Sequence, residues 1–367
     1  MKKILITNKL FPVECGGSEK FIWDIAKILA EEGYKVHLLT PATDKKLPEI
    51  PNINYHFIPS STSYWGKRIA YLSKGFLYTK NVVKKVEPDL IIDNASPIPF
   101  YPIYLFTKNI KKTMVLHAIF KKNVFKFKDN LFTKFLTYFS EQSLRLFKNI
   151  DYIAVSKSTK AELQSIIGNR EVSIIENSFD PYKFEYNFYD EDTFLLTLTR
   201  LSNRKGLKYL LYAWKKLNLN IPLKIAGSGP QKERLVKLKN KLNLKNVEFL
   251  GYVSEEKKVD LLKKAKLYIL PTLGEGFGIS NLEAMASGTP VISSDTWGVK
   301  DYIVDGENGL LAQPGNSDEL AEKIELAMSD PKLRKKISQN ARQTAEKYTI
   351  DNTKNQVINY INDVFNN

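Results

Sequence analysis

The stretch LGEGFGISNLEAMASG, residues 273–288, places two glutamates eight positions apart around a glycine-rich turn. The glycines disfavour a helix before Ile279, and the residues that follow Ser280 have a helical pattern, so a helix should begin at these two positions. Amides at a helix N-terminus attract anions, whereas the carboxylates of Glu275 and Glu283 suit hydroxyl groups. A nucleotide sugar carries both phosphates and hydroxyls and would use the whole stretch. A surface helix with a glycine-rich entry and no ligand is the alternative.

Short apolar strands alternate with helical patterns on both sides of this stretch. Two such series imply two parallel sheets, each covered by helices on both faces. The expected architecture is therefore α/β, with two Rossmann-like domains joined near residues 180–192 and a ligand in the cleft at the carboxyl ends of the strands. The expected strands lie within residues 2–8, 34–41, 88–94, 112–118, 151–156 and 172–177, and within 193–200, 223–229, 247–253, 266–272 and 289–295.

The composition is that of a globular protein. A chain of 367 residues with 43% hydrophobic residues can bury the cores of two ordinary domains. Cys15 is the only cysteine, which excludes a disulfide framework and fits a reducing cytosol. The chain start resembles no signal peptide, and no stretch approaches the roughly 20 apolar residues of a membrane span. We expect a protein that is soluble or rests on a membrane without crossing it.

Positive charge is concentrated in two segments of the first half. Residues 67–86 hold six basic residues and no acidic one, and residues 119–148 hold seven basic and two acidic residues. Residues 119–148 also contain seven phenylalanines and one tyrosine. Such local basicity indicates an anionic partner, and an anionic membrane surface is our hypothesis. The alternative is a core of phenylalanines beneath a solvated basic face.

Further candidate residues follow expected strands. Gly16 and Gly17 come after the first strand, where bare backbone can approach a phosphate. Arg200 and Lys205 flank the turn after the first strand of the second series, and two cations at one strand end suit a diphosphate. His117 ends an apolar strand, so it is either a core histidine or a catalytic one.

Several competing motifs are absent. The sequence has no ATPase-type phosphate-binding loop, and the dinucleotide fingerprint lacks its third glycine because Lys232 stands there. The three histidines have no cysteine or carboxylate at metal-binding spacing, so no metal site is expected.

The chain resembles the retaining family-four glycosyltransferases (glycosyl transferases group 1), which have the GT-B fold. The resemblance lies in Arg200 with Lys205 and Gly206, in the fragments AGSGP, FLGYVSEE and DGENGLL, and in the run ILPTLGEGFGISNLEAMASGTPVISSD. The first half adds GGSE, the strand that ends at His117, VSKSTKAEL and IIENSFDPYKF. The chain departs from the family pattern at Asn177-Ser178 and at Trp297-Gly298 with Asp301.

The resemblance implies a role for each candidate. Glu275 and His117 would be catalytic, with His117 approaching the sugar from the other domain. Glu283 would accept hydrogen bonds from the ribose. The donor sugar would contact Gly276, Phe277 and Gly278, and the diphosphate would contact Gly16, Gly17, Arg200, Lys205, Ile279 and Ser280. No cofactor or metal is implied, because these cations and the helix N-terminus stabilise the leaving nucleoside diphosphate.

The expected enzyme is a retaining hexosyltransferase that uses a UDP- or GDP-sugar. Residues 1–180 would bind the acceptor, residues 187–348 would bind the nucleotide sugar, and residues 349–367 would form a helix that packs back on the first domain. The expected acceptor is a lipid-linked glycan or glycolipid at the cytoplasmic face of the cell membrane, where the enzyme would be peripheral. A soluble glycosyltransferase acting on a small molecule or polysaccharide is the alternative.

Two hypotheses from other functional classes stay open. The interleaved lysines and phenylalanines of residues 120–135 also suit a nucleic-acid binder, although that function leaves residues 273–288 unexplained. The second hypothesis is a nucleotide-sugar epimerase of similar two-domain shape. Detection of sugar on an acceptor, rather than a changed or hydrolysed donor, distinguishes these classes.

Overall fold

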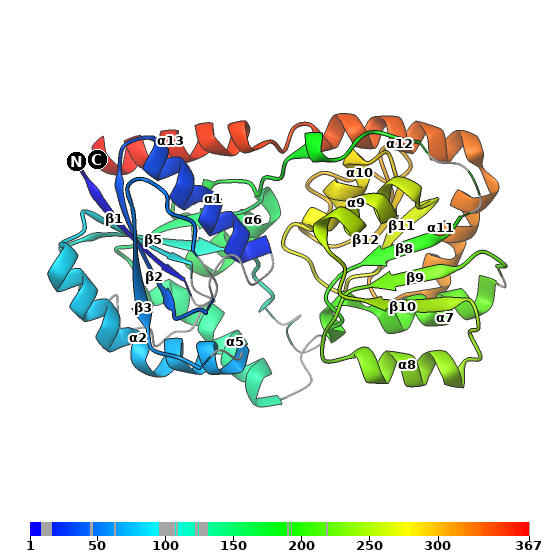
Figure 1. Cartoon of the computed structure of the whole chain (residues 1–367), viewed down its shortest axis with the longest axis horizontal. Coiled ribbons are helices and arrows are strands. Elements are labelled where there is room, and N and C mark those ends of the chain that lie inside the picture. The colour runs from blue at the N-terminus through cyan, green and yellow to red at the C-terminus, as the bar shows by residue number, and fades with distance from the viewer. Residues whose placement is uncertain are drawn as a thin grey trace. The chain divides into compact units, whose positions relative to one another are not determined.

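The computed structural model describes residues 1–8, 17–44, 47–61, 64–94, 107, 109–121, 124, 131–188, 191, 193–217 and 219–366. It divides into two compact units (Figure 1). Unit 1 comprises residues 1–121, 135–178 and 350–367, and unit 2 comprises residues 122–134 and 179–349. Each unit is built around one parallel sheet.

The sheet of unit 1 has seven parallel strands in the order β3-β2-β1-β4-β5-β6-β7. The strand order runs outward in both directions from β1 and β4, so the carboxyl ends of these two neighbours form the topological switch point where α/β sheets bind ligands. The strands are β1 (Lys3–Asn8), β2 (Lys35–Pro41), β3 (Ile53–Ile58), β4 (Leu90–Asn94), β5 (Lys111–Leu116), β6 (Asp151–Ala154) and β7 (Ser173–Ile174).

Helices cover both faces of this sheet because strand side chains alternate between the faces. Ile4 and Ile6 of β1 pack in one cluster with α1 (Gly17–Glu31) and α13 (Ile350–Asn366). Leu5, between them, packs in the opposite cluster with α2 (Tyr64–Val86). On that second face α6 (Lys157–Ile167) covers β5 and β6. Helix α5 (Leu131–Ser143), of which residues 135–143 belong to unit 1, is followed directly by a short 3-10 helix (Leu144–Leu146).

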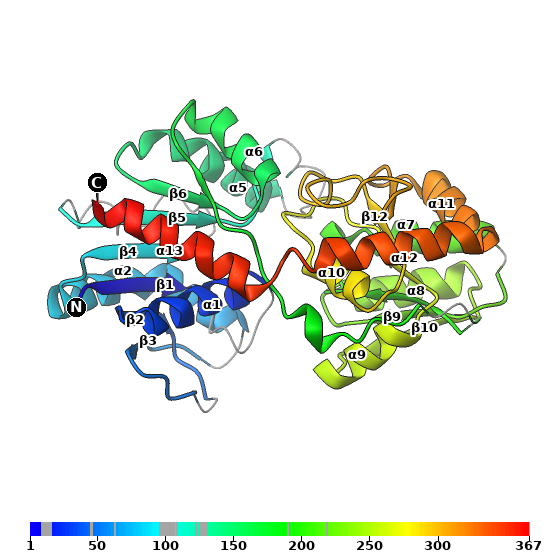
Figure 2. The same cartoon turned by 90° about the horizontal axis from the view of Figure 1, so that it is seen from above.

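Helix α13 follows unit 2 in sequence but belongs to unit 1. It lies beside α1 in both views (Figures 1 and 2). Lys111 donates to the carbonyl oxygen of Val364 at 2.5 Å, and the hydroxyl groups of Thr113 and Tyr360 are 2.5 Å apart. These bonds and the buried apolar face of α13 make the helix part of the unit 1 core.

The sheet of unit 2 has six parallel strands in the order β10-β9-β8-β11-β12-β13. The strands are β8 (Leu195–Leu198), β9 (Leu223–Ala226), β10 (Val247–Gly251), β11 (Leu267–Leu270), β12 (Val291–Ser294) and β13 (Leu310–Ala312). The helices are α7 (Leu207–Leu217), α8 (Lys232–Lys241), α9 (Glu255–Lys264), α10 (Ile279–Ala286), α11 (Ser317–Ser329) and α12 (Pro331–Ala345).

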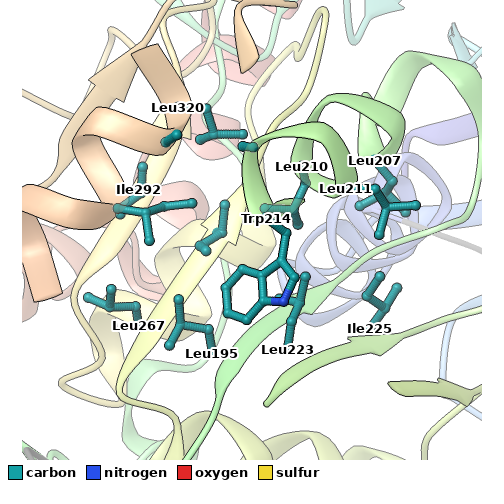
Figure 3. Close-up of a cluster of buried hydrophobic side chains, with 14 of the residues drawn as sticks. Leu195, Leu207, Leu210, Leu211, Trp214, Leu223, Ile225, Leu267, Ile292 and Leu320 are labelled. Atoms are coloured by element: carbon teal, nitrogen blue, oxygen red, sulfur yellow. The ribbon is translucent and has the colours of Figure 1, made fainter. Parts of the chain in front are cut away.

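The two faces of this sheet have separate apolar clusters. Trp214 of α7 packs with Leu195, Leu223 and Leu267 of three adjacent strands, as Figure 3 shows. The opposite face packs against α9, α10 and α12, with Leu282 of α10 fully buried. Because both faces of the sheet are covered, the side chains on either side of each strand are buried, and the strands are therefore nearly continuous apolar runs in the sequence.

The expectation of two parallel α/β sheets is confirmed. Strands β3 and β13 were not predicted from the sequence. A strand was predicted across residues 172–177, where only the two residues of β7 pair with β6.

Candidate active site

The loop from β11 to α10 is fixed by glycines at two points. Gly278 has φ +91°, and a Cβ there would lie 2.9 Å from the hydroxyl oxygen of Tyr302 and 3.2 Å from Cγ of Glu275. Gly206, at the end of the turn after β8, has φ +65°, and a Cβ there would lie 1.9 Å from the carbonyl oxygen of Pro271. Both positions need a left-handed backbone and close approach, which only glycine accommodates.

Glu275 sits in this loop between two cations. Its side chain is 10% exposed and forms ion pairs with Lys205 and with Nη1 of Arg204, the latter at 3.2 Å. Arg204 also donates to the carbonyl oxygen of Gly274 at 2.8 Å. The structure therefore brings together the β8 turn and the β11–α10 loop at the carboxyl edge of the sheet. Two cations face one carboxylate, so the cluster keeps a surplus positive charge.

The cations determine the ionisation of Glu275. Burial alone would raise its pKa, but the charges of Lys205 and Arg204 outweigh burial and lower the pKa to about 2. Burial also lowers the pKa of Lys205, and Arg204 acts in the same direction, while Glu275 opposes both. Glu275 is thus a fixed carboxylate at every physiological pH.

The N-terminus of α10 is directed by the same loop. Gly278 is its N-cap and provides no side chain, and the amide of Asn281 bonds to the carbonyl oxygen of Gly278 at 2.9 Å. Ile279 and Ser280 begin the helix and are partly exposed. The Tyr302 hydroxyl donates to the carbonyl oxygen of Phe277 at 2.8 Å and supports the loop from behind. This helix end can accept an anion.

Glu283 lies one turn further along α10 and is also paired with a lysine. Lys258 of α9 contacts it at 2.6 Å and contacts Glu255 at 2.7 Å. Burial alone would lower the pKa of Lys258, but the effect of Glu283 and Glu255 is larger and opposite, so the pKa of Lys258 is raised above its usual value. Lys258 was not predicted as a site residue, because nothing in the spacing of residues 255–283 distinguishes it from the other lysines of α9.

The remaining cation predicted for this edge is Arg200, which is exposed and follows β8. Its neighbour in the turn, Arg204, was not singled out in the sequence, although it directly precedes Lys205 in SNRKG. The prediction placed Lys205 on the diphosphate, and here Lys205 contacts Glu275.

Unit 1 has its own group of polar side chains at the switch point. His117 follows β5, and its Nε2 lies 2.7 Å from Oδ1 of Asn94, the last residue of β4. Asn94 donates to Oδ1 of Asn8, the last residue of β1, at 3.0 Å and to the carbonyl oxygen of Ser18 at 3.2 Å. His117 also packs edge-to-face on Phe21 of α1. Asn8 and Asn94 were missed, although each ends an apolar strand.

Gly17 is the first residue of α1, whereas Gly16 lies outside the described residues. Within the described ranges, no three His, Cys, Asp or Glu side chains gather as a metal site requires. None of the helices in the described part of the chain has the length and apolarity to cross a bilayer.

Solved structures with the same architecture are GT-B glycosyltransferases. A sucrose-phosphate synthase from Thermosynechococcus elongatus superposes with a TM-score of 0.87 at 21% identity, covering 100% of this chain and 99% of that chain. Anabaena HepE, solved in complex with UDP and glucose, has a TM-score of 0.76 at 21% identity and covers 99% and 100% of the two chains. The fold is therefore GT-B.

Two family models narrow the class. "Glycosyl transferases group 1" matches residues 178–344, and "Glycosyltransferase Family 4" matches residues 15–183. An uncharacterized glycosyltransferase of Methanocaldococcus jannaschii is 28% identical over 98% of this chain and 97% of its own length. The N-acetylgalactosamine-N,N'-diacetylbacillosaminyl-diphospho-undecaprenol 4-alpha-N-acetylgalactosaminyltransferase of Campylobacter jejuni is 26% identical over 92% and 94%. The chain belongs to the group 1, family-four-like glycosyltransferases.

Proposed function

We propose that the protein is a retaining, metal-independent hexosyltransferase that uses a UDP- or GDP-sugar and a lipid-linked acceptor. The observation that carries this proposal is the Glu275 cluster, in which a carboxylate is held by Arg204 and Lys205 beside the N-terminus of α10. The reaction breaks the bond between the anomeric carbon and the diphosphate oxygen and forms a bond from that carbon to the acceptor oxygen. The proton of the acceptor hydroxyl passes to the departing nucleoside diphosphate.

In this proposal, different residues of the Glu275 cluster bind the diphosphate and the sugar of the donor. The diphosphate carries the negative charge that a surplus cation and an uncapped helix N-terminus attract. Lys205 would then be shared between Glu275 and the leaving phosphate, while Arg204 keeps the carboxylate in place. Glu275 accepts hydrogen bonds only, because its pKa is about 2, and it suits the hydroxyls of the transferred sugar. The structure of HepE with UDP and glucose supports a uridine nucleotide as the first donor to test.

Glu283 is proposed to bind the ribose. The side chain of Glu283 is only 14% exposed, and its ion pair with Lys258 orients the carboxylate. An ionised carboxylate has about four lone-pair sites and only accepts hydrogen bonds, so its chemistry suits two adjacent ribose hydroxyls. No step of this proposal uses a metal, because the cations carry the charge of the leaving group.

A lipid-linked acceptor is supported by an apolar stripe on α5 and by one relative. Phe135 and Phe139, one turn apart and stacked with ring centroids 6.3 Å apart, are 45% and 60% exposed. Leu131 and Leu136 of the same helix and the nearby Leu146 are exposed as well. The relative from Campylobacter jejuni has an acceptor named as a diphospho-undecaprenol. Exposed aromatics beside basic residues suit the headgroup region of an anionic bilayer at the cytoplasmic face.

The test of the enzyme activity is transfer from a panel of UDP- and GDP-sugars to an undecaprenyl-diphosphate-linked glycan, with the anomeric configuration of the product read by NMR. We expect transfer with retention that EDTA does not stop. Glu275→Gln should abolish transfer while nucleotide binding persists, and Glu283→Gln should weaken nucleotide binding. Loss of activity in EDTA that magnesium restores would contradict the metal-free mechanism. Transfer to a water-soluble acceptor alone would favour the soluble alternative.

The membrane part has a separate test. Co-sedimentation with vesicles should be stronger for phosphatidylglycerol than for phosphatidylcholine and should decrease with salt. Phe135→Ser with Phe139→Ser should reduce binding, whereas the control Tyr182→Ser with Tyr252→Ser, two exposed tyrosines of unit 2, should not. Equal binding to the two vesicle types would end the proposal of an anionic surface. The basic residues Lys122, Lys126 and Lys128 of this region lie outside the described residues.

A further inference from the structure

The amino-terminal edge of the unit 1 sheet holds a cavity of about 560 Å³. It lies at the opposite edge from His117 and Asn94, because Lys3, Lys35 and Ile53 begin their strands whereas Asn94 ends one. Within unit 1, the cavity is therefore separate from the polar group formed by His117, Asn94 and Asn8. Its lining residues are Lys3, Lys35, His37, Ile53, Asn54, Tyr55, His56, Lys85 and Val86.

The lining is basic and includes no carboxylate. Lys3 donates to the carbonyl oxygen of Val86 at 2.8 Å, which fixes its ammonium group at the rim. Lys35 and Lys85 are exposed, and neither forms an ion pair with a carboxylate of the described residues. Asp89, which is outside the lining, accepts from the backbone amide of Lys3 at 2.7 Å. Three ammonium groups from three elements thus converge without a counter-charge among the lining residues.

A pair of stacked histidines forms part of the wall. Nδ1 of His37 lies 2.9 Å from Nε2 of His56, and the ring centroids are 5.2 Å apart. The His37 residue is only 8% exposed, and its Nε2 has no hydrogen-bond partner among the described residues. A buried polar atom without a partner is costly and uncommon in a folded protein. It needs a ligand or a water that is not part of the chain.

The electrostatic environment keeps this pair uncharged. Burial, then His56, Lys35 and Lys3 lower the pKa of His37 to about 4. Burial and Lys85 lower the pKa of His56. Every charged group named here is a cation, so an anion in the cavity would oppose the shift and favour protonated imidazole. Two histidines without a carboxylate or thiolate make a poor metal site.

We propose that this cavity binds the phosphate monoester group of a small molecule or of a lipid headgroup. A dianionic phosphate matches the two unpaired lysines, and its oxygens accept from ammonium and imidazole donors. A single carboxylate would leave one of these lysines without a counter-charge. The site is independent of the glycosyltransferase reaction, so its failure and the failure of the proposed activity would be distinguishable.

The histidines themselves provide the readout, since the chain has only three. Ring carbon–proton NMR signals are assigned with His37→Gln, His56→Gln and His117→Gln and are then followed as inorganic phosphate is added at constant ionic strength. We expect the signals of His37 and His56 to move and saturate at millimolar phosphate, with the apparent pKa of both rings raised. Phosphate bound at the other edge of the sheet would instead report at His117.

Two charge variants and two lipids complete the test. Lys35→Gln with Lys85→Gln should abolish the response, whereas Lys74→Gln with Lys84→Gln, exposed lysines of α2 outside the lining, should preserve it. Vesicles containing phosphatidic acid, which has a phosphate monoester, should reproduce the response if the source is a lipid, and vesicles containing phosphatidylglycerol should not. No movement with either phosphate or phosphatidic acid, or an equal response to chloride, would overturn the proposal.

Discussion

Replacing Glu275 by glutamine keeps the shape of the side chain but removes the charge that faces Lys205 and Arg204. The side chains of Glu275 and Lys205 are 10% and 12% exposed, so water can replace little of the lost interaction. The pKa of Glu275 is lowered from 4.5 to about 2, and at about 1.4 kcal/mol for each pH unit this corresponds to a stabilisation on the order of 3 kcal/mol. We expect Glu275→Gln to lower the free energy of unfolding by a similar amount, because a buried lysine loses its partner.

A double-mutant cycle tests this reasoning. Glu275→Gln, Lys205→Met and the double variant are compared with the wild type by native-state hydrogen exchange of β8 and β11, which isolates unit 2. Each single change should cost roughly 3 kcal/mol, and the double variant should cost at least about 1.5 kcal/mol less than the sum. Additive effects would refute the ion pair as the source of the lowered pKa.

The pH dependence follows from the direction of the shift. Since the folded pKa of Glu275 is below the unfolded value, its stabilisation is fully present above about pH 4.5 and is lost as the pH falls toward about 2. The coupling energy of the cycle should therefore be constant near neutral pH and decline in acid. A coupling energy that grows in acid would contradict the assignment.

Three further outcomes are expected. Gly206→Ala should lower the free energy of unfolding of unit 2 by more than about 3 kcal/mol in urea, because a strained backbone and a backbone clash combine there. The control Gly306→Ala should cost about 1 kcal/mol, since its φ is also positive, at +75°, but its Cβ would meet nothing within 4 Å. Equal costs for the two variants would contradict the clash. Asn94→Ala should change the pH profile of transfer more than the KM for donor, because it removes the 2.7 Å contact to His117; an unchanged profile would leave the contact structural. The stabilisation associated with the lowered pKa of His37 is present above about pH 6.5 and lost as the pH falls toward about 4. The opening free energy of β2, obtained from hydrogen exchange after division by the intrinsic amide rate at each pH, should therefore fall across that range in wild type and less in His37→Gln.

Much of the fold could be predicted because buried parallel strands have a simple sequence pattern. The start of α10 was predicted from the glycines that precede Ile279, and the helix does begin at that residue. Strand β3 was missed because only its first and last residues, Ile53 and Ile58, are buried, and its middle is polar or aromatic. Strand β13 has only three residues, too few for any periodicity to be seen.

The site was only partly predictable, for a different reason. The sequence singled out Glu275 and Lys205, but it could not show that Arg204 pairs with the carboxylate, since two arginines follow β8 within six residues. Lys258 pairs with Glu283 across 25 positions. Asn8 and Asn94 meet across 86 positions because β1 and β4 are neighbours in the sheet, which only the strand order reveals.

The position of α13 has a consequence for how the protein is made. Unit 2 is largely one continuous segment, residues 179–349, and is synthesised before α13. The part of the α1 surface that α13 covers therefore stays exposed on the ribosome until residues 350–366 emerge, although α1 is among the first elements translated. During that interval the apolar cluster that α1 shares with α13 lacks Val357, Tyr360, Ile361 and Val364. Nascent chains stalled before residue 350 should therefore be bound by a holdase chaperone through α1, and that binding should end once Tyr360 and Val364 have left the exit tunnel.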